Sequence, residues 1–327
     1  MRIVVTGGAG FIASNIVDRL LTDGHEVVVL DNFDPYYDPA QKRANIRLAQ
    51  KNENYRLVEA DVRDRAAVDR VFSDFSPEHV VHLAAKAGVR SSMADPASYV
   101  TVNELGGLNV LDACRQGGSI PMILASTSSA YGRAPAPFKE SHPAVGPLSP
   151  YAASKRGAEL MAHAYRDLYD SPIAILRFFT VYGPRGRPDM ATWMFTEAIQ
   201  AGKSIYMHGE DTERDFTFVD DIVDGVVGAM SWLTKTRGFD TFNLGRSDPY
   251  RVRTFIETLA KLLGREATIE VGTLQPGESR VTCADISHAT DAFGYQPKIS
   301  LEEGLARWVQ WYEHSDESPL HRRAPRS

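Results

Sequence analysis

A glycine-rich turn near the amino terminus constrains the fold more than any other feature of this chain. The segment Thr6-Gly7-Gly8-Ala9-Gly10-Phe11-Ile12-Ala13 follows an apolar run at residues 2–6 and precedes a helical pattern at residues 13–23. In such a unit Gly7 permits a tight turn, and Gly10 lets a pyrophosphate approach the backbone and the helix N-terminus. A glycine-rich turn also occurs as a structural loop, but its place between a strand and a helix predicts a dinucleotide site.

Short β-branched runs alternate with helical patterns through the first half of the chain. We predict strands at residues 2–6, 26–31, 56–59, 79–83, 121–126 and 173–178, and helices at residues 13–23, 65–75, 99–116 and 151–169. Apolar strands that alternate with helices indicate a parallel sheet covered on both faces. Right-handed crossovers then give a doubly wound Rossmann fold of the α/β class.

The alternation ends after Phe179, where Pro, Gly and Arg cluster at residues 182–188. This change in composition predicts a second, smaller α/β domain that binds the substrate. We expect the dinucleotide-binding domain to span residues 1–178, with a return of the chain at about 216–246. The substrate domain is expected at residues 179–215 and 247–313, and a charged tail rich in Ser and Pro at residues 314–327 is expected to be disordered.

The ends of the predicted strands supply the other cofactor candidates. Asp31 lies about 20 residues beyond the glycines, where a carboxylate binds ribose hydroxyls and repels a 2′-phosphate, so NAD is favoured over NADP; the alternative for Asp31 is a turn residue. Asp61 fits either an adenine contact or a helix N-cap. The predicted cofactor set is Gly7, Gly10, Phe11, Ile12, Asp31, Asn32, Asp61, Val62, Leu83, Ala84, Ala85, Lys86, Tyr151 and Lys155.

Tyr151 and Lys155 lie four residues apart near the start of a predicted helix, so both side chains point from one face. A lysine ammonium and a nicotinamide cation beside the phenol favour the phenolate, which is a usable general base. This pair is more often part of a helix surface, but here it follows the dinucleotide turn and a hydroxyl-rich strand end. That strand end, Ser126-Thr127-Ser128-Ser129-Ala130-Tyr131-Gly132, predicts either groups that orient a sugar hydroxyl or a plain polar loop.

The glycine turn, the hydroxyl run and Tyr151-Ala152-Ala153-Ser154-Lys155 together resemble the extended short-chain dehydrogenase/reductase family. Within that family the chain, from Met1 to about Tyr312, is most similar to UDP-glucuronate 4-epimerases. Ala13 departs from the family, in which glycine is usual at this position. The most specific matches are Asp31-Asn32-Phe33-Asp34-Pro35-Tyr36-Tyr37-Asp38-Pro39 and Arg177-Phe178-Phe179-Thr180-Val181-Tyr182-Gly183-Pro184-Arg185-Gly186-Arg187-Pro188-Asp189-Met190.

The resemblance implies that Thr127, Tyr151 and Lys155 form the catalytic set. Tyr151 would take the proton from the sugar 4-hydroxyl while C4 gives its hydride to NAD⁺. The 4-keto sugar would then turn and accept the hydride on its other face, so that NAD behaves as a bound prosthetic group. The resemblance also implies a homodimer in which helices 99–116 and 151–169 form a four-helix bundle; their apolar residues could equally face only the core.

A uronate substrate requires groups that hold its carboxylate. Arg187 and Thr180 are candidates, since Arg offers a planar fork and Thr a hydroxyl; the alternative for Arg187 is a structural residue that bonds loop carbonyls. Arg214 matches a diphosphate-binding position of related sugar-nucleotide enzymes, and Arg280 fits the same contact or a surface salt bridge. The predicted substrate set is Arg90, Ser128, Ser129, Thr180, Arg187, Arg214 and Arg280.

Oxidation at C4 of a uronate produces a β-keto acid, which loses CO₂ when its C5–carboxylate bond aligns with the carbonyl π system. Related decarboxylases and dehydratases carry an acidic residue beside the catalytic Thr or Ser, where this chain has Ser128 and Ser129. We therefore predict interconversion of UDP-glucuronate and UDP-galacturonate. The alternatives are epimerisation of a neutral UDP-sugar, decarboxylation of UDP-glucuronate, and a catalytically silent NAD-sensing scaffold.

Composition excludes several other classes. A net charge of −6 does not favour binding to nucleic acid or to an anionic membrane. No apolar run reaches the ~18 to 20 residues that span a bilayer, and no signal-peptide pattern precedes the first strand. The two cysteines have no regular spacing, which indicates reduced thiols and a cytoplasmic protein. The histidines show no ligand spacing, so no metal site is expected.

Overall fold

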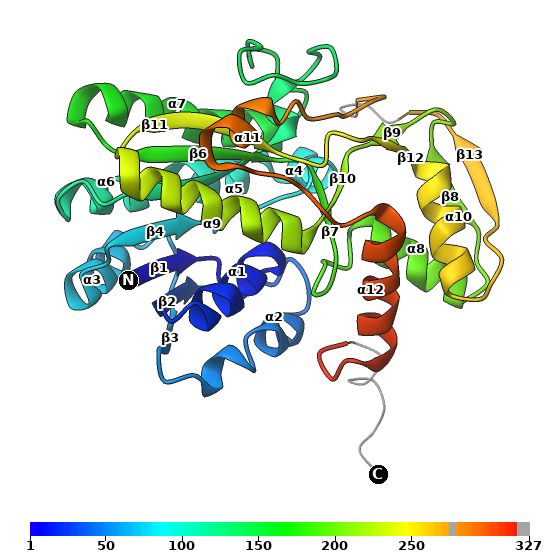
Figure 1. Cartoon of the computed structure of the whole chain (residues 1–327), viewed down its shortest axis with the longest axis horizontal. Helices are drawn as coiled ribbons and strands as arrows, with labels where there is room; N and C mark the ends of the chain where they lie inside the picture. Colours follow the sequence, from blue (N-terminus) through cyan, green and yellow to red (C-terminus); the bar gives the residue numbers. More distant parts are fainter. Residues whose placement is uncertain (275–278, 319–327) are drawn as a thin grey trace.

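The computed structural model describes residues 1–274 and 279–318, and a single parallel sheet organises them (Figure 1). The sheet has seven strands in the order β11-β6-β5-β4-β1-β2-β3, and every neighbouring pair is parallel. The doubly wound α/β fold is therefore confirmed. The strands are β1 (Arg2–Thr6), β2 (Glu26–Asp31), β3 (Tyr55–Glu59), β4 (His79–His82), β5 (Met122–Thr127), β6 (Ile173–Phe178) and β11 (Phe239–Leu244).

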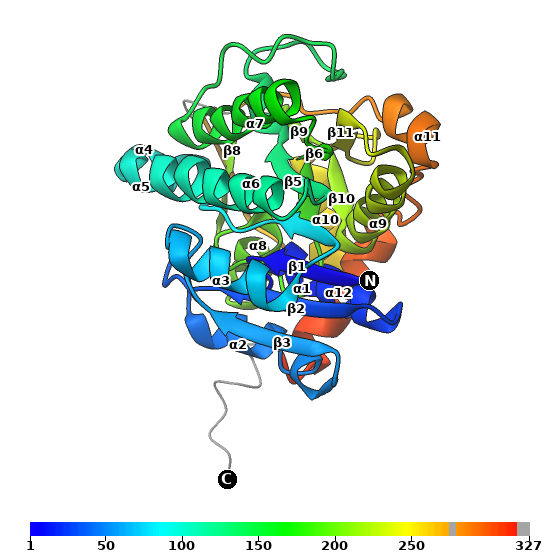
Figure 2. The ribbon, with the colours of Figure 1, turned by 90° about the vertical axis from the view of Figure 1, so that its left-hand side faces the viewer.

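Helices cover both faces of the sheet (Figure 2). One face carries α1 (Phe11–Thr22), α9 (Val219–Thr236) and α11 (Ser287–Phe293). The other face carries α3 (Arg65–Phe75), α6 (Gly107–Gln116) and α7 (Pro150–Tyr169). The short helices α4 (Val89–Ala94) and α5 (Pro96–Tyr99) lie beside α7, and α2 (Pro39–Asn45) follows β2. The helix predicted at residues 99–116 is interrupted, because its first part is the π-helix η2 (Val100–Gly106).

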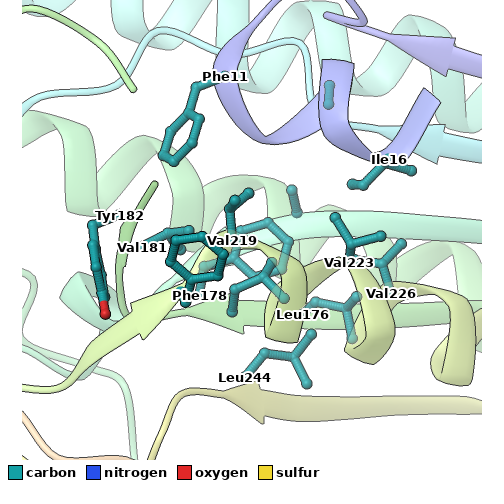
Figure 3. Packing of buried hydrophobic residues seen from close by; sticks show 14 of the residues in the cluster. Phe11, Ile16, Leu176, Phe178, Val181, Tyr182, Val219, Val223, Val226 and Leu244 are labelled. Atoms are coloured by element: carbon teal, nitrogen blue, oxygen red, sulfur yellow. The ribbon is translucent and has the colours of Figure 1, made fainter. Parts of the chain in front are cut away.

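The inner strands are apolar on both sides because each side packs against helices, whereas the edge strands β3 and β11 are only partly buried. Val5 and Val29 belong to the cluster under α1 and α9, whereas Val4 and Val28 belong to the cluster under α3, α6 and α7. The first cluster contains Phe11 and Ile16 of α1, Val223 and Val226 of α9, and Leu176 and Leu244 of the sheet (Figure 3). This packing fixes the start of α1, and therefore the glycine turn, against the sheet.

Beyond the carboxyl ends of the strands lies a smaller region built of strand pairs and helices (Figure 1). Its helices α10 and α12 pack on each other, and the chain returns to the central sheet as β11 between its segments. Its elements are β7 (Thr180–Tyr182), α8 (Ala191–Gln200), β8 (Ile205–His208), β9 (Glu213–Arg214), β10 (Phe216–Phe218), β12 (Tyr250–Arg251), α10 (Val252–Leu262), β13 (Ile269–Gly272) and α12 (Leu301–His314).

The end of the chain is ordered further than the sequence indicates. Helix α12 includes His314, and residues 315–318 fold back so that Glu317 and Ser318 are buried. Glu317 accepts two hydrogen bonds from the buried Arg185, at 2.8 and 3.1 Å, and this pairing orders the segment. The prediction of disorder from residue 314 is therefore wrong for residues 314–318; residues 319–327 lie outside the described part of the chain.

No helix in the described ranges is long and apolar enough to cross a membrane.

Candidate active site

A cleft runs along the carboxyl ends of the central strands, where ligands of open α/β sheets bind. Every predicted cofactor residue lines it, from Gly7 at the first turn to Lys155 in α7. The cleft is also lined by residues that the sequence did not single out for the site: Ala13, Leu30, Asp34, Tyr36, Tyr37, Lys42, Ala60, Ala87, Val102, Ala125, Ser126, Phe178, Phe179, Val181 and Met190.

The glycine turn has the geometry of a phosphate cradle. Gly7 has φ of 72° and donates its N–H to Leu30 O at 2.7 Å; a Cβ on Gly7 would lie 2.7 Å from Ala84 N. Only glycine fits this close approach. Gly10 is the N-cap of α1 and has no side chain to accept the first-turn N–H groups, and Gly10, Phe11 and Ile12 line the cleft, so these groups and the positive end of the helix dipole are available to a ligand there. This end of the cleft therefore fits a pyrophosphate.

Two carboxylates follow the next strands. Asp31 accepts hydrogen bonds from Ala9 N at 3.0 Å and from Phe33 N at 2.8 Å, so it braces the glycine turn while it lines the cleft. Asp61 accepts from Asn32 Nδ2 at 2.8 Å and from the guanidinium of Arg63. The Arg63 hydrogen bond lowers the pKa of Asp61 to about 2. The N-cap alternative for Asp61 is wrong, since Asp64 caps α3.

The wall after β4 is held by an asparagine that the sequence analysis missed. Asn103 accepts from Lys86 N at 2.7 Å, and its Nδ2 donates to Lys86 O at 3.0 Å and to Ser154 Oγ at 2.9 Å. Asn103 lies in η2, and π-helical turns are frequent at functional sites. Nothing in the helical pattern of residues 99–116 marks this residue, because its partners are distant in sequence.

Tyr151, Lys155 and Thr127 come together at one point of the cleft. Ser149 caps α7 by accepting from Ala152 N at 3.2 Å, and Pro150 occupies the first helical position, so the helix starts directly before Tyr151. Thr127, the last residue of β5, lines the cleft together with Tyr151. Burial raises the pKa of Tyr151, while the Thr127 hydroxyl and the charge of Arg187 oppose the rise. Burial lowers the pKa of Lys155 to about 8.

A buried ionic network supports this constellation from behind. Glu159, one turn after Lys155, is fully buried and accepts from Arg177 Nε at 2.9 Å and Nη2 at 2.7 Å. It also accepts from Ser126 Oγ at 2.5 Å and from Arg156 Nη1 at 2.7 Å. The network joins β5, β6 and α7, and therefore fixes the helix that carries Tyr151 against the strand that carries Thr127.

A second cavity adjoins the cleft and brings together four predicted substrate residues, Ser128, Ser129, Thr180 and Arg214. The linings of the two cavities are adjacent in sequence, since Thr127 and Phe179 line the first and the next residues, Ser128 and Thr180, line the second. Arg90 and Arg280 are exposed and lie outside both linings, although their neighbours Val89 and Ser279 line the second cavity. The Arg280 carbonyl accepts from Arg214 Nη1 at 3.2 Å.

Arg187 lines the first cavity with the catalytic candidates rather than the second. Its Nε and Nη2 donate to the two carboxylate oxygens of Asp189, both at 2.9 Å. The alternative in which Arg187 bonds loop carbonyls is therefore not what the structure shows, since its measured partner is a carboxylate. Among the described residues no group of three or more His, Cys, Asp or Glu is placed to hold a metal ion.

Comparisons with known proteins agree with this geometry. Residues 4–308 match the family model described as GDP-mannose 4,6 dehydratase. A probable UDP-glucuronate 4-epimerase of Rhizobium meliloti is 39% identical, over 96% of this chain and 98% of the relative. The UDP-glucuronate 4-epimerase of Thermodesulfobacterium geofontis is 40% identical, over 96% and 97%.

A solved structure of similar shape is the UDP-glucuronic acid 4-epimerase of Bacillus cereus in complex with UDP-glucuronic acid and NAD. The TM-score is 0.89 at 35% identity, and the match covers 95% of this chain and 98% of that one. The chain therefore belongs to the GDP-mannose 4,6-dehydratase-like branch of the extended short-chain dehydrogenase/reductase family, in which its relatives include UDP-glucuronate 4-epimerases.

Proposed function

We propose that the chain is an NAD-dependent enzyme that interconverts UDP-glucuronate and UDP-galacturonate. The observation that carries this proposal is the meeting of Tyr151, Thr127 and Lys155 with Arg187 in one cleft, next to a phosphate cradle. A general base and a cation that can bind a carboxylate are the two groups that C4 chemistry on a uronate requires.

The cleft residues fit NAD. The first turn of α1 would hold the pyrophosphate, Asp31 the adenosine ribose, and Asp61 with Val62 the adenine. Lys86 and the alanines before it would form the wall along which the cofactor lies. When bound, NAD supplies the hydride acceptor for C4 of the sugar and returns the hydride to the opposite face.

The proton is handled by the chain itself. We assign Tyr151 as the base that takes the proton of the 4-hydroxyl and later returns it. Lys155, as an ammonium group below pH about 8, favours the phenolate, and the Thr127 hydroxyl, which lines the same cleft and helps to lower the pKa of the phenol, would orient the reacting oxygen. Ser128 and Ser129 continue the row of hydroxyls toward the second cavity.

The rest of the substrate is assigned by charge and position. Arg187, with Thr180, would hold the uronate carboxylate out of alignment with the C4 carbonyl, which prevents loss of CO₂. Arg214 would contact the diphosphate in the second cavity, and Arg280, which follows the lining residue Ser279, is a candidate for the same contact. Arg90, which follows the lining residue Val89, is a weaker candidate for the carboxylate. In this arrangement residues 1–178 and about 216–246 bind NAD, while residues 179–215 and 247–313 bind the UDP-sugar.

We also propose a cytoplasmic homodimer. Cys114 and Cys283 are both free, which suits a reducing compartment. Four large apolar side chains are exposed on the two neighbouring helices η2 and α7: Val100 (47%), Leu105 (47%), Leu160 (55%) and Met161 (39%). Exposed apolar patches of this kind mark interfaces, and this one lies on the side of the molecule formed by α4 to α7 (Figure 2).

The direct test is to incubate the purified protein with UDP-glucuronate, without added reductant, and to follow the products by proton NMR. Appearance of UDP-galacturonate with all carbon retained is the expected result. A UDP-pentose together with CO₂ would assign the chain as a decarboxylase instead. Turnover of UDP-glucose but not of UDP-glucuronate would show a neutral-sugar epimerase, and NAD binding without turnover of either sugar would show a sensor.

A further inference from the structure

The two most specific segments of the sequence, residues 31–39 and 177–190, meet in the structure through one hydrogen bond. Tyr36 Oη donates to Asp189 Oδ2 at 3.0 Å, across 153 positions of sequence. The same carboxylate accepts Nε and Nη2 of Arg187, and the Arg187 guanidinium lies 6.0 Å from the centre of the Tyr36 ring. A tyrosine, a carboxylate and an arginine therefore form one unit at the edge of the cleft.

The contact with Asp189 determines which N–H groups of the Arg187 guanidinium are left for a ligand. A guanidinium carries five N–H donors in a planar fork. Asp189 engages Nε and one N–H of Nη2, and this bidentate contact fixes the guanidinium plane. The distal edge, formed by Nη1 and the other N–H of Nη2, is not used by Asp189 and has the shape that a second carboxylate requires. Arg187 keeps 23% of its side chain exposed and lines the cleft with Tyr151.

Hydrogen bonds tie this unit to the wall that carries the catalytic tyrosine. Tyr36 Oη lies 3.1 Å from Ser91 Oγ, which lies 2.6 Å from Tyr99 Oη. With the Tyr36 proton directed to Asp189, Ser91 donates to Tyr36 and Tyr99 donates to Ser91. The Tyr99 hydroxyl also lies 3.1 Å from Ala87 O, and its ring packs edge-on against Tyr151, with the ring centres 6.2 Å apart. Since an ionised carboxylate has no proton, Tyr36 must be the donor to Asp189.

Gly88 shows that space is kept for this connection. It has φ of 120°, and a Cβ at this position would lie 2.6 Å from Ser91 Oγ and 2.8 Å from Tyr36 Oη. A side chain here would push the two hydroxyls apart. Glycine at this position after β4 therefore leaves room for Tyr36, Ser91 and Tyr99 to contact one another.

We propose that Asp189 and Tyr36 are positioning residues, which hold the Arg187 guanidinium so that its distal edge grips the carboxylate of the sugar; this inference rests on the proposed function. The orientation matters because C4 oxidation makes a β-keto acid. If the carboxylate swings into alignment with the carbonyl, the C5–carboxyl bond breaks, its electron pair forms the C4 enolate, and a proton added at C5 gives the 4-keto pentose and CO₂. The unit therefore controls both affinity for a uronate and the ratio of epimerisation to decarboxylation.

The test compares Asp189→Asn and Tyr36→Phe with the unaltered enzyme. Dissociation constants of the NAD-loaded protein for UDP-glucuronate and for UDP-glucose are measured by calorimetry, and released CO₂ is measured per turnover. We expect Asp189→Asn to weaken UDP-glucuronate binding about tenfold, the equivalent of one lost charge-assisted contact. UDP-glucose binding should stay unchanged, and the CO₂ yield should rise. Tyr36→Phe should act in the same direction with a smaller effect.

The control is Glu303→Gln, which alters an exposed pair with Arg307 on α12 and should change neither constant. An Asp189→Asn variant that binds UDP-glucuronate more tightly would show that Asp189 competes with the substrate, and would overturn the proposal. Equal weakening for both sugars, or an unchanged affinity and CO₂ yield, would overturn it as well. An unaltered protein that epimerises UDP-glucose but not UDP-glucuronate would instead refute the proposed function itself, and this inference with it.

Discussion

Tyr151 shows how much a catalytic role depends on its neighbours. Its burial raises the pKa of the phenol, so the side chain needs nearby positive charge and the Thr127 hydroxyl to act as a base. Tyr151→Phe removes the only atom that exchanges the proton and keeps the ring that packs against Tyr99. We expect kcat to fall about 10²- to 10⁴-fold, measured by proton NMR, with an unchanged circular dichroism spectrum. Full turnover in this variant would refute the proposed mechanism.

The second prediction concerns Lys155 and the dependence of turnover on pH. Burial lowers its pKa to about 8, so the side chain is an ammonium below this pH and neutral above it. Turnover should therefore decline as the pH rises through about 8, because the charge that favours the Tyr151 phenolate is lost. An arginine stays charged to a pH of about 12 or above, so the decline in Lys155→Arg should move upward. A pH profile of kcat for both proteins checks this, and an identical alkaline limb in both would contradict the assignment.

Helix α7 carries a buried charge that joins it to the sheet. Glu159 holds this helix to β5 and β6 through Ser126 and Arg177, and Arg177 also stacks over the Tyr131 ring at 4.5 Å. Glu159→Ala leaves the Arg177 guanidinium buried without its counter-ion. We expect a loss of about 3–5 kcal/mol in the free energy of unfolding, measured with urea. Asp23→Asn, in an exposed pair with Arg19, is the control and should change stability by about 0.5 kcal/mol or less. If Glu159→Ala also changed the free energy of unfolding by only this small amount, the network would not stabilise the fold as proposed.

Sequence periodicity predicts most of the central strands, but it does not predict the π-helix or the short strands that pair beyond the sheet. Six of the seven central strands were predictable because they are β-branched or apolar runs between helical patterns, and the turn at Gly7 because few sequences permit it. Strand β11 (Phe239–Leu244) was not predicted, since Asp240 and Asn243 interrupt its apolar pattern. The π-helix around Asn103 was not predictable, since its wider turn is stabilised by Lys86 and Ser154, which are remote in sequence. The short strands beyond β6 pair across long separations, and no local period marks such pairs.

For the candidate site, the residues proposed to perform chemistry were predictable from the sequence, whereas those proposed to position them were not. Tyr151 and Lys155 were identified by their spacing in one helix, and the structure places them in the cleft with Thr127. Asp189 and Tyr36 act through a contact that only the folded chain creates. The pairing of Arg185 with Glu317 likewise depends on how the chain end folds back, and composition alone indicated disorder there.

At the scale of the whole molecule, the described chain builds its own cleft but leaves an apolar surface uncovered. The residues proposed for catalysis all line one cleft of a single chain. A dimer would therefore stabilise the folded protein and would not be needed to complete the site. The exposed Val100, Leu105, Leu160 and Met161 lie on η2 and α7. These two helices pack closely at Gly157, where an added Cβ would lie 2.7 Å from the Glu104 side chain. This rigid apolar face is what two copies related by a twofold axis can bury against each other.

Leu160→Asp places a charge in the middle of this face and should convert a dimer into a monomer, because an unpaired carboxylate is costly to bury in an apolar interface. Sedimentation velocity measures the outcome directly. Met194→Asp, a change of another exposed apolar residue on α8, is the matched control and should leave the dimer intact. The monomeric variant should retain turnover, since its cleft is complete within one chain. A monomeric unaltered protein, or a Leu160→Asp variant that sediments as a dimer, would show that this face is not the interface between subunits.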